Sequence, residues 1–202
     1  MDSSTNFKII KDRILSSEYG TVFVATDFVE IANKTSINTY LSRLVNEKLI
    51  RRILRGVYYK AEYNEFLEEY VAPLPDDVAH ALSRNYGWTI VPCGDTALNI
   101  LGLSTQIPAA WVYVSDGKYD EYTYDNTTIK FKRTTNKEIS KLSYKTALVV
   151  QALKALGKDG VKEATITKLK NTLTNEEKDT LLAESKAVTS WIYEYIKVIC
   201  RS

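Results

Sequence analysis

The sequence has few of the residues from which many metal and enzyme sites are built. Its 202 residues include one histidine and two cysteines, Cys93 and Cys200, which form no CxxC pair. A zinc site with cysteine and histidine ligands cannot be assembled from this set, and we expect no metal and no cofactor. Two isolated cysteines are typical of small buried side chains in a reducing compartment.

Several sequence motifs are missing as well. No GxGxxG, P-loop or GxSxG pattern occurs, so the sequence contains no dinucleotide fingerprint, phosphate loop or serine nucleophile elbow. No apolar run approaches the length of a membrane span, and the opening residues contain no apolar signal-peptide core. These absences predict a soluble cytoplasmic protein with no membrane partner.

Carboxylates in the middle of the chain are the remaining candidates for catalysis. They are Asp76, Asp77, Asp95, Asp116, Asp120, Glu121 and Asp125. No two of them form a recognisable ligand motif, and their positions at a helix start or in turns indicate structural roles. His80 has no nucleophile motif or acid motif beside it. We therefore predict no enzyme, and an enzyme that uses these carboxylates is the weakest alternative.

Charge is distributed unevenly along the chain. The net charge is +2, but residues 1–60 contain ten bases and six acids, residues 61–125 contain two bases and eleven acids, and residues 126–202 contain fifteen bases and eight acids. An acidic middle is repelled by a phosphate backbone, so contact with nucleic acid is expected only at the two ends. Apolar residues make up 45% of the chain, which is enough for a packed core.

In the segment 34–60, the apolar residues first follow the spacing of a helix and then that of β-strands. Ile37, Tyr40, Leu41, Leu44 and Val45 follow the spacing of an amphipathic helix, and its other face is short, polar and poor in acids. Two β-prone runs around an Arg-Gly turn then predict a hairpin. The segment contains seven bases and one acid. Any solvated helix can show such a face, and arginines can simply keep an edge strand soluble.

The preceding elements favour a DNA-binding interpretation. A first helix over 5–17, a β-prone run over 21–24 and a second helix capped by Thr26 or Asp27, with Glu30 completing the capping box, come before the basic helix. This order predicts a winged helix-turn-helix over 1–62, whose third helix enters the major groove. Asn38 and Arg43 suit base edges, and Arg51, Arg52 and Arg55 suit phosphates. The full set of expected DNA contacts is Lys34, Thr35, Ser36, Asn38, Thr39, Arg43, Arg51, Arg52, Arg55 and Lys60.

A second domain is expected after the wing. Residues 61–72 have the pattern of an acidic helix, and Pro73 and Pro75 place a domain border within 62–76. We expect the domain to cover 63–202, with a mixed sheet at about 76–134 and helices over 140–202, including one opened by a capping box of Thr174 and Glu177. The predicted class is α+β, a winged helix-turn-helix followed by a mixed α/β domain with a helical C-terminal part.

Residues 94–109 are polar at a few positions in an apolar stretch. Gly94, Asn99, Ser104, Thr105 and Gln106 form this candidate motif. It is either a capped loop between a helix and a strand or a contact surface of the second domain.

The chain resembles the AbiE-type antitoxins of bacterial type IV toxin–antitoxin systems over about residues 7–156. The resemblance rests on LSRLV, LIRR and RGVY in the winged-helix segment, on Pro92-Cys93-Gly94, and above all on ALNILGLSTQIP at 97–108. It implies an antitoxin that represses its own operon by binding double-stranded promoter DNA at repeats. It also implies that a cognate nucleotidyltransferase toxin is countered without a stable complex, by a monomer or a DNA-induced oligomer. The main alternative is a ligand- or partner-responsive winged-helix regulator with no toxin.

Overall fold

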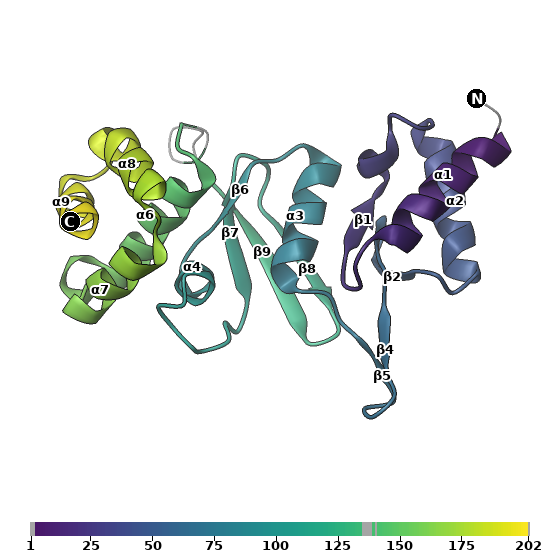
Figure 1. The fold of residues 1–202 in the computed structure, drawn as a ribbon, viewed down its shortest axis with the longest axis horizontal. Coiled ribbons are helices and arrows are strands. Elements are labelled where there is room, and N and C mark those ends of the chain that lie inside the picture. The colour runs from purple at the N-terminus through teal and green to yellow at the C-terminus, as the bar shows by residue number, and fades with distance from the viewer. Residues whose placement is uncertain (1–2, 135–138, 140, 202) are drawn as a thin grey trace. The chain divides into compact units, whose positions relative to one another are not determined.

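The computed structural model describes residues 3–134, 139 and 141–201, with helices and strands interspersed up to Arg133 and helices after it (Figure 1). The predicted mixture of α and β structure is confirmed. The chain divides into two compact units, residues 1–88 and 89–202. The first unit extends past the expected border at 62–76 because α3 (Pro75–Tyr86) packs against strands of that unit.

The first unit begins with the predicted order of elements. α1 (Ser3–Ser16) is followed by β1 (Val22–Val24), the 3-10 helix η1 (Ala25–Phe28), α2 (Lys34–Asn46), β2 (Arg51–Leu54) and β3 (Val57–Tyr59). The three strands form an antiparallel sheet in the order β1-β3-β2. Gly56, at a φ of 78°, makes the turn between β2 and β3 in the left-handed region that glycine tolerates best.

The core of this unit lies between α1, α2 and one face of the sheet. Its buried side chains are Ile10, Ile14, Phe23, Ala25, Phe28, Ile37, Tyr40, Leu41, Leu44, Ile50 and Tyr58. The apolar stripe predicted for α2 supplies four of them, Ile37, Tyr40, Leu41 and Leu44. Full burial of an aliphatic or aromatic side chain stabilises the fold by about 1.5–3 kcal/mol, so this stripe determines which face of α2 remains in solvent.

The predicted second helix is shorter than expected. Only Ala25–Phe28 are helical, and Asp27 is not its first residue. The Asp27 carboxylate instead accepts a hydrogen bond from the Val24 backbone nitrogen at 2.9 Å and pairs with Arg84 of α3. Glu30 pairs with Arg13 rather than completing a capping box with Asp27. The long-range partners on α1 and α3 therefore override the local capping pattern.

The predicted acidic helix at 61–72 is wrong, because this segment is a hairpin of β4 (Glu62–Asn64) and β5 (Glu69–Val71). The Asn64 side chain accepts hydrogen bonds from the backbone nitrogens of Phe66 and Leu67, which turns the chain back. The rings of Tyr63 and Tyr70 then meet edge to face at 5.0 Å across the strands. Local side-chain bonds and a cross-strand pair replace the helical ladder.

Helix α3 is fixed to the first unit by Arg84. Its guanidinium donates to both oxygens of Asp27, at 2.8 and 3.2 Å, and to the carbonyl of Val22 at 3.2 Å. The helix starts at Pro75, which needs no backbone donor there, and ends at Gly87 in the left-handed conformation.

The second unit contains a mixed four-stranded sheet in the order β6-β7-β9-β8, as the sequence pattern predicted in outline. Its strands are β6 (Ile90–Pro92), β7 (Trp111–Ser115), β8 (Asp120–Tyr124) and β9 (Thr127–Arg133). The central pair, β7 and β9, is parallel, and the other pairings are antiparallel. The short helix α4 (Asp95–Ile100) contacts β6 and β7.

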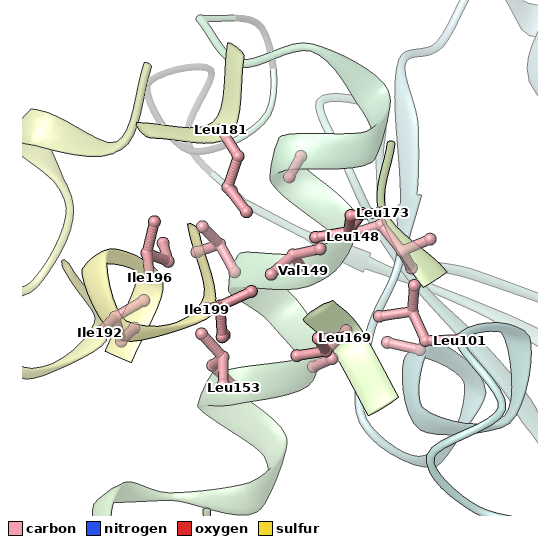
Figure 2. Packing of buried hydrophobic residues seen from close by; sticks show 14 of the residues in the cluster. Leu101, Leu148, Val149, Leu153, Leu169, Leu173, Leu181, Ile192, Ile196 and Ile199 are labelled. Carbon is pink, nitrogen blue, oxygen red and sulfur yellow. The ribbon is translucent and has the colours of Figure 1, made fainter. Parts of the chain in front are cut away.

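A helical part completes this unit and contains its main core. Its elements are α6 (Tyr144–Leu156), η2 (Lys158–Gly160), α7 (Glu163–Thr172), α8 (Asn175–Glu184), η3 (Ser185–Ala187) and α9 (Ser190–Cys200). Figure 2 shows Leu148, Val149 and Leu153 of α6 surrounded by side chains of the other helices. Residues 146–153 of α6 are all buried, as its apolar sequence predicted. The predicted Thr174–Glu177 capping box is confirmed. None of the helices within the described ranges is long and apolar enough to cross a membrane.

Candidate nucleic-acid interface

The exposed face of α2 is polar along its whole length. Lys34, Thr35, Asn38, Thr39 and Arg43 are exposed, and Ser36 is half-buried. The Asn33 side chain caps the helix by accepting from the Ser36 nitrogen at 3.0 Å. The hydroxyl of Thr39 bonds back to the Thr35 carbonyl at 3.1 Å. The predicted set therefore forms one continuous surface on a helix whose other face is anchored in the core.

Arg43 is engaged by its own unit. Its Nε donates to Glu47 at 2.9 Å, and its guanidinium lies 4.2 Å from the centre of the Phe7 ring. Lys11 of α1 donates to the other oxygen of Glu47 at 2.7 Å. The hydrogen bond from Lys11, and next that from Arg43, lower the pKa of Glu47. Arg43 thus joins α1 to α2, which the sequence alone did not indicate.

The hairpin of β2 and β3 presents its three arginines to solvent. Arg51, Arg52 and Arg55 are all exposed. Arg51 stacks on the Tyr70 ring of β5, with its guanidinium carbon 4.0 Å from the ring centre. No carboxylate that the structure describes pairs with its charge. In the described part of the chain, Arg52 donates only to the Leu54 carbonyl, at 3.3 Å, within the same hairpin. Among the described residues, neither Arg55 nor Lys34 has a side-chain hydrogen bond or ion pair.

Lys60 differs from these bases. Its ammonium donates to the carbonyls of Leu15 and Ser17, both at 2.7 Å, and lies 4.8 Å from the Tyr19 ring. A cation at the C-terminus of a helix satisfies carbonyls that have no partner within the helix. Lys60 therefore caps α1, and its partners lie more than forty residues away in sequence.

The polar residues of the candidate motif at 94–109 bond mainly to one another. Gly94 has a φ of 59° and a ψ of −142°, a backbone conformation that is nearly restricted to glycine. The Asn99 amide donates to the Gln106 carbonyl at 3.0 Å, and the Gln106 nitrogen donates to the Ser104 hydroxyl at 3.2 Å. Thr105 is exposed. Gly94 thus shapes the entry to α4, and Asn99, Ser104 and Gln106 shape the loop that follows it.

One residue of this region was not selected from the sequence. Thr96 is fully buried, and its hydroxyl accepts a hydrogen bond from the Val112 nitrogen at 2.7 Å. It joins the start of α4 to β7. A threonine in the first turn of a short helix gives no sequence pattern that would distinguish this role from ordinary capping.

The carboxylates considered for catalysis have local partners. Asp116 accepts from the Thr89 nitrogen at 2.8 Å, Asp120 pairs with Lys118 at 3.0 Å, and Glu121 pairs with Lys130 at 3.1 Å. Asp125 has a φ of 45° in the turn between β8 and β9. Asp95 lies in the first turn of α4.

The remaining two lie in the first turn of α3. An Asp76 carboxylate oxygen lies 3.6 Å from Nε2 of His80. Burial raises the pKa of Asp77, and the charge of Asp76 raises it further. Throughout the described ranges, no cluster of three acidic, histidine or cysteine side chains is arranged to hold a metal ion.

A protein-family model matches residues 9–181. The chain belongs to DUF6088, a family of unknown function. The DUF6088 match includes α2, the β2–β3 hairpin and residues 94–109, and it ends within α8. No curated protein matches the chain. Membership of DUF6088 assigns no activity to the chain.

Proposed function

We propose that the first unit is a winged helix-turn-helix that binds double-stranded DNA, with α2 in the major groove and the β2–β3 hairpin as the wing. The observation that supports this best is the sheet order β1-β3-β2 together with the polar face of α2. In that arrangement the third helical segment and the hairpin are the parts that approach DNA.

The exposed side chains divide between base and phosphate contacts. Asn38 lies one turn after Lys34 and Thr35, near the N-terminus of α2, where recognition helices contact base edges. Its amide is suited to a bidentate contact with adenine. Lys34, Arg51, Arg52 and Arg55 supply positive charge for phosphates. Arg43 and Lys60 remain with the protein, because each already has two partners within the first unit.

We further propose that the protein is an antitoxin that represses its own operon and counters a nucleotidyltransferase toxin. This proposal rests on the resemblance to AbiE-type antitoxins, in particular on residues 97–108. The polar side chains of that segment mostly bond within the loop, so the exposed Thr105 and the outer surface of the loop are the parts left to meet a partner.

A gel-shift titration with the DNA upstream of the gene tests the first proposal. Asn38→Ala should weaken binding to that DNA by about 1–3 kcal/mol and leave binding to unrelated DNA almost unchanged. Lys186→Glu is a control, because Lys186 is an exposed base of the second unit. Equal loss on both DNAs would contradict the assignment of Asn38 to a base.

Co-expression with a nucleotidyltransferase encoded next to the gene tests the antitoxin proposal. The full chain should rescue growth, and a variant with Arg52→Ala and Arg55→Ala should still rescue while it no longer represses the promoter. Failure of the intact chain to rescue would refute the antitoxin function and leave DNA binding standing.

A ligand-responsive regulator is the second candidate, and one cavity favours it. The cavity has a volume of about 610 Å³, within the usual range for small-molecule sites, and lies in the first unit between α3, β5 and the start of β1. Its lining includes Glu18, Glu62, Asp77 and His80 beside apolar side chains. Ala72→Trp, which would fill part of this space, should abolish an effector response and leave DNA binding without effector intact.

A further inference from the structure

The β4–β5 hairpin exposes large apolar side chains that the proposed DNA contact does not use. Phe66 at its tip is 93% exposed, and Leu67 beside it is 57% exposed. Tyr63, Tyr70 and Val71 are also exposed. The hairpin contains four glutamates, Glu62, Glu65, Glu68 and Glu69, and no base. Exposed apolar side chains within one charged segment are typical of an interaction surface.

The charge of this hairpin argues against two possible partners, DNA and a second copy of the hairpin. DNA would be repelled by four glutamates on ten residues. Pairing of the hairpin with the same hairpin of a second molecule would place acids against acids, which protects exposed strand edges from such association. The surface that fits the hairpin is therefore apolar in its centre and basic around it.

The outer face of α9 has this character. A hollow of about 550 Å³ is lined by Trp191, Tyr195 and Val198 together with Lys158, Lys197 and Arg201; Ser190 and Glu194 complete it. The two rings meet edge to face at 6.2 Å, and the Tyr195 hydroxyl donates to the Lys158 carbonyl at 3.1 Å, which fixes the ring. Lys197 pairs with Glu194 at 2.8 Å, so Lys158 and Arg201 supply the net positive charge.

We propose that the hairpin tip of one molecule docks in the α9 hollow of a second copy of this chain. Phe66 and Leu67 would enter the hollow, and Glu65 and Glu68 would face Lys158 and Arg201. The contact joins unlike surfaces, so it either closes into a small ring or continues as an open chain. This self-association is independent of DNA binding and is measured without DNA.

The strength of the contact follows from its size. Four tip residues bury less than the roughly 1,200 Å² of a stable interface, so we expect a dissociation constant on the order of 10–100 μM. Charge attraction acts mainly across the exposed rim, and association should therefore weaken as salt is raised.

Sedimentation velocity over a concentration series tests the proposal. The intact chain should associate, and Phe66→Ser should weaken association by about tenfold or more, as should Lys158→Glu combined with Arg201→Glu. Val29→Ser and Lys186→Glu are matched controls, because Val29 is 59% exposed in the first unit and Lys186 is an exposed base in the second. Both controls should associate like the intact chain. Circular dichroism and thermal melting of every variant should match those of the intact chain.

Two combinations identify the contact itself. A mixture of the Phe66→Ser variant with the Lys158→Glu, Arg201→Glu variant should form a one-to-one complex and nothing larger, because each retains one intact surface. Glu65→Lys and Glu68→Lys, introduced together with Lys158→Glu and Arg201→Glu, should restore association. A chain that stays monomeric up to about 1 mM, or variants that associate as well as the intact chain, would overturn the proposal. Loss of association that the charge exchange does not restore would also overturn it.

Discussion

The salt dependence of DNA binding can separate bases that contact phosphate from bases that hold the fold together. Six basic side chains of the proposed DNA-binding region behave in two ways. Lys34, Arg51, Arg52 and Arg55 are exposed and meet no carboxylate that the structure describes, whereas Arg43 and Lys60 have fixed partners.

The expected magnitude follows from counterion release. Each phosphate contact contributes about 0.9 to the slope of log K against log salt, so four contacts predict a slope of about −3.6. A fourfold rise in salt would then weaken binding about 150-fold for the intact chain and about 40-fold for Arg55→Ala. Arg43→Ala and Lys60→Ala should leave the slope near its original value. Each should instead lower the free energy of unfolding by about 1 kcal/mol, through the lost ring contact and ion pair of Arg43 or the lost cap from Lys60.

The assay is fluorescence anisotropy with a short duplex of the upstream DNA, titrated at several salt concentrations. Urea unfolding of each variant, followed by circular dichroism, measures its free energy of unfolding. If Lys60→Ala lowers the slope as much as Arg55→Ala while stability is unchanged, Lys60 contacts phosphate and its assignment as the cap of α1 is wrong. If none of the four exposed bases changes the slope, α2 and the hairpin are not the DNA surface.

Further predictions concern stability. Leu153→Ala should lower the free energy of unfolding by about 2–5 kcal/mol, because Leu153 of α6 is fully buried in the core of the second unit; urea unfolding with amide exchange should localise the loss to residues 89–202. Asn33→Ala should lower the free energy of unfolding of the first unit by about 0.5–2 kcal/mol, because it removes the cap of α2. Asn33→Asp should retain most of this stability, because an aspartate can also cap the helix. The lowered pKa of Glu47 stabilises the fold fully above the ordinary glutamate pKa, and that stabilisation is lost as pH falls through the lowered value. Glu47→Gln should therefore weaken the fall in the free energy of unfolding as pH drops into the acid range. An unchanged pH dependence would show that Glu47 does not contribute to it.

Patterns confined to a few consecutive residues could be predicted from the sequence. The 3.6-residue spacing of apolar side chains in α2 determined its buried face. The two β-prone runs after α2 determined the β2–β3 hairpin. The Thr174 and Glu177 capping box formed as predicted, because both partners lie within one turn of each other. The apolar run of α6 likewise predicted burial on nearly every side.

Competing local bonds and interactions across long sequence distances decided the rest. Residues 61–72 have a helical pattern, but Asn64 and the Tyr63–Tyr70 pair form a hairpin. Arg84 ties α3 to Asp27, so the first unit reaches residue 88. The parallel pairing of β7 with β9 was likewise not specified by either strand alone.

The same distinction applies to the candidate interface. The sequence determined that a basic helix and hairpin exist and that the helix has a polar face, because spacing and charge are local properties. Only the tertiary structure decided that Arg43 stacks on Phe7 and that Lys60 caps α1, since those partners come from a helix far away in sequence. A cation that already has such partners loses them if it turns to a phosphate, whereas Arg55 loses nothing.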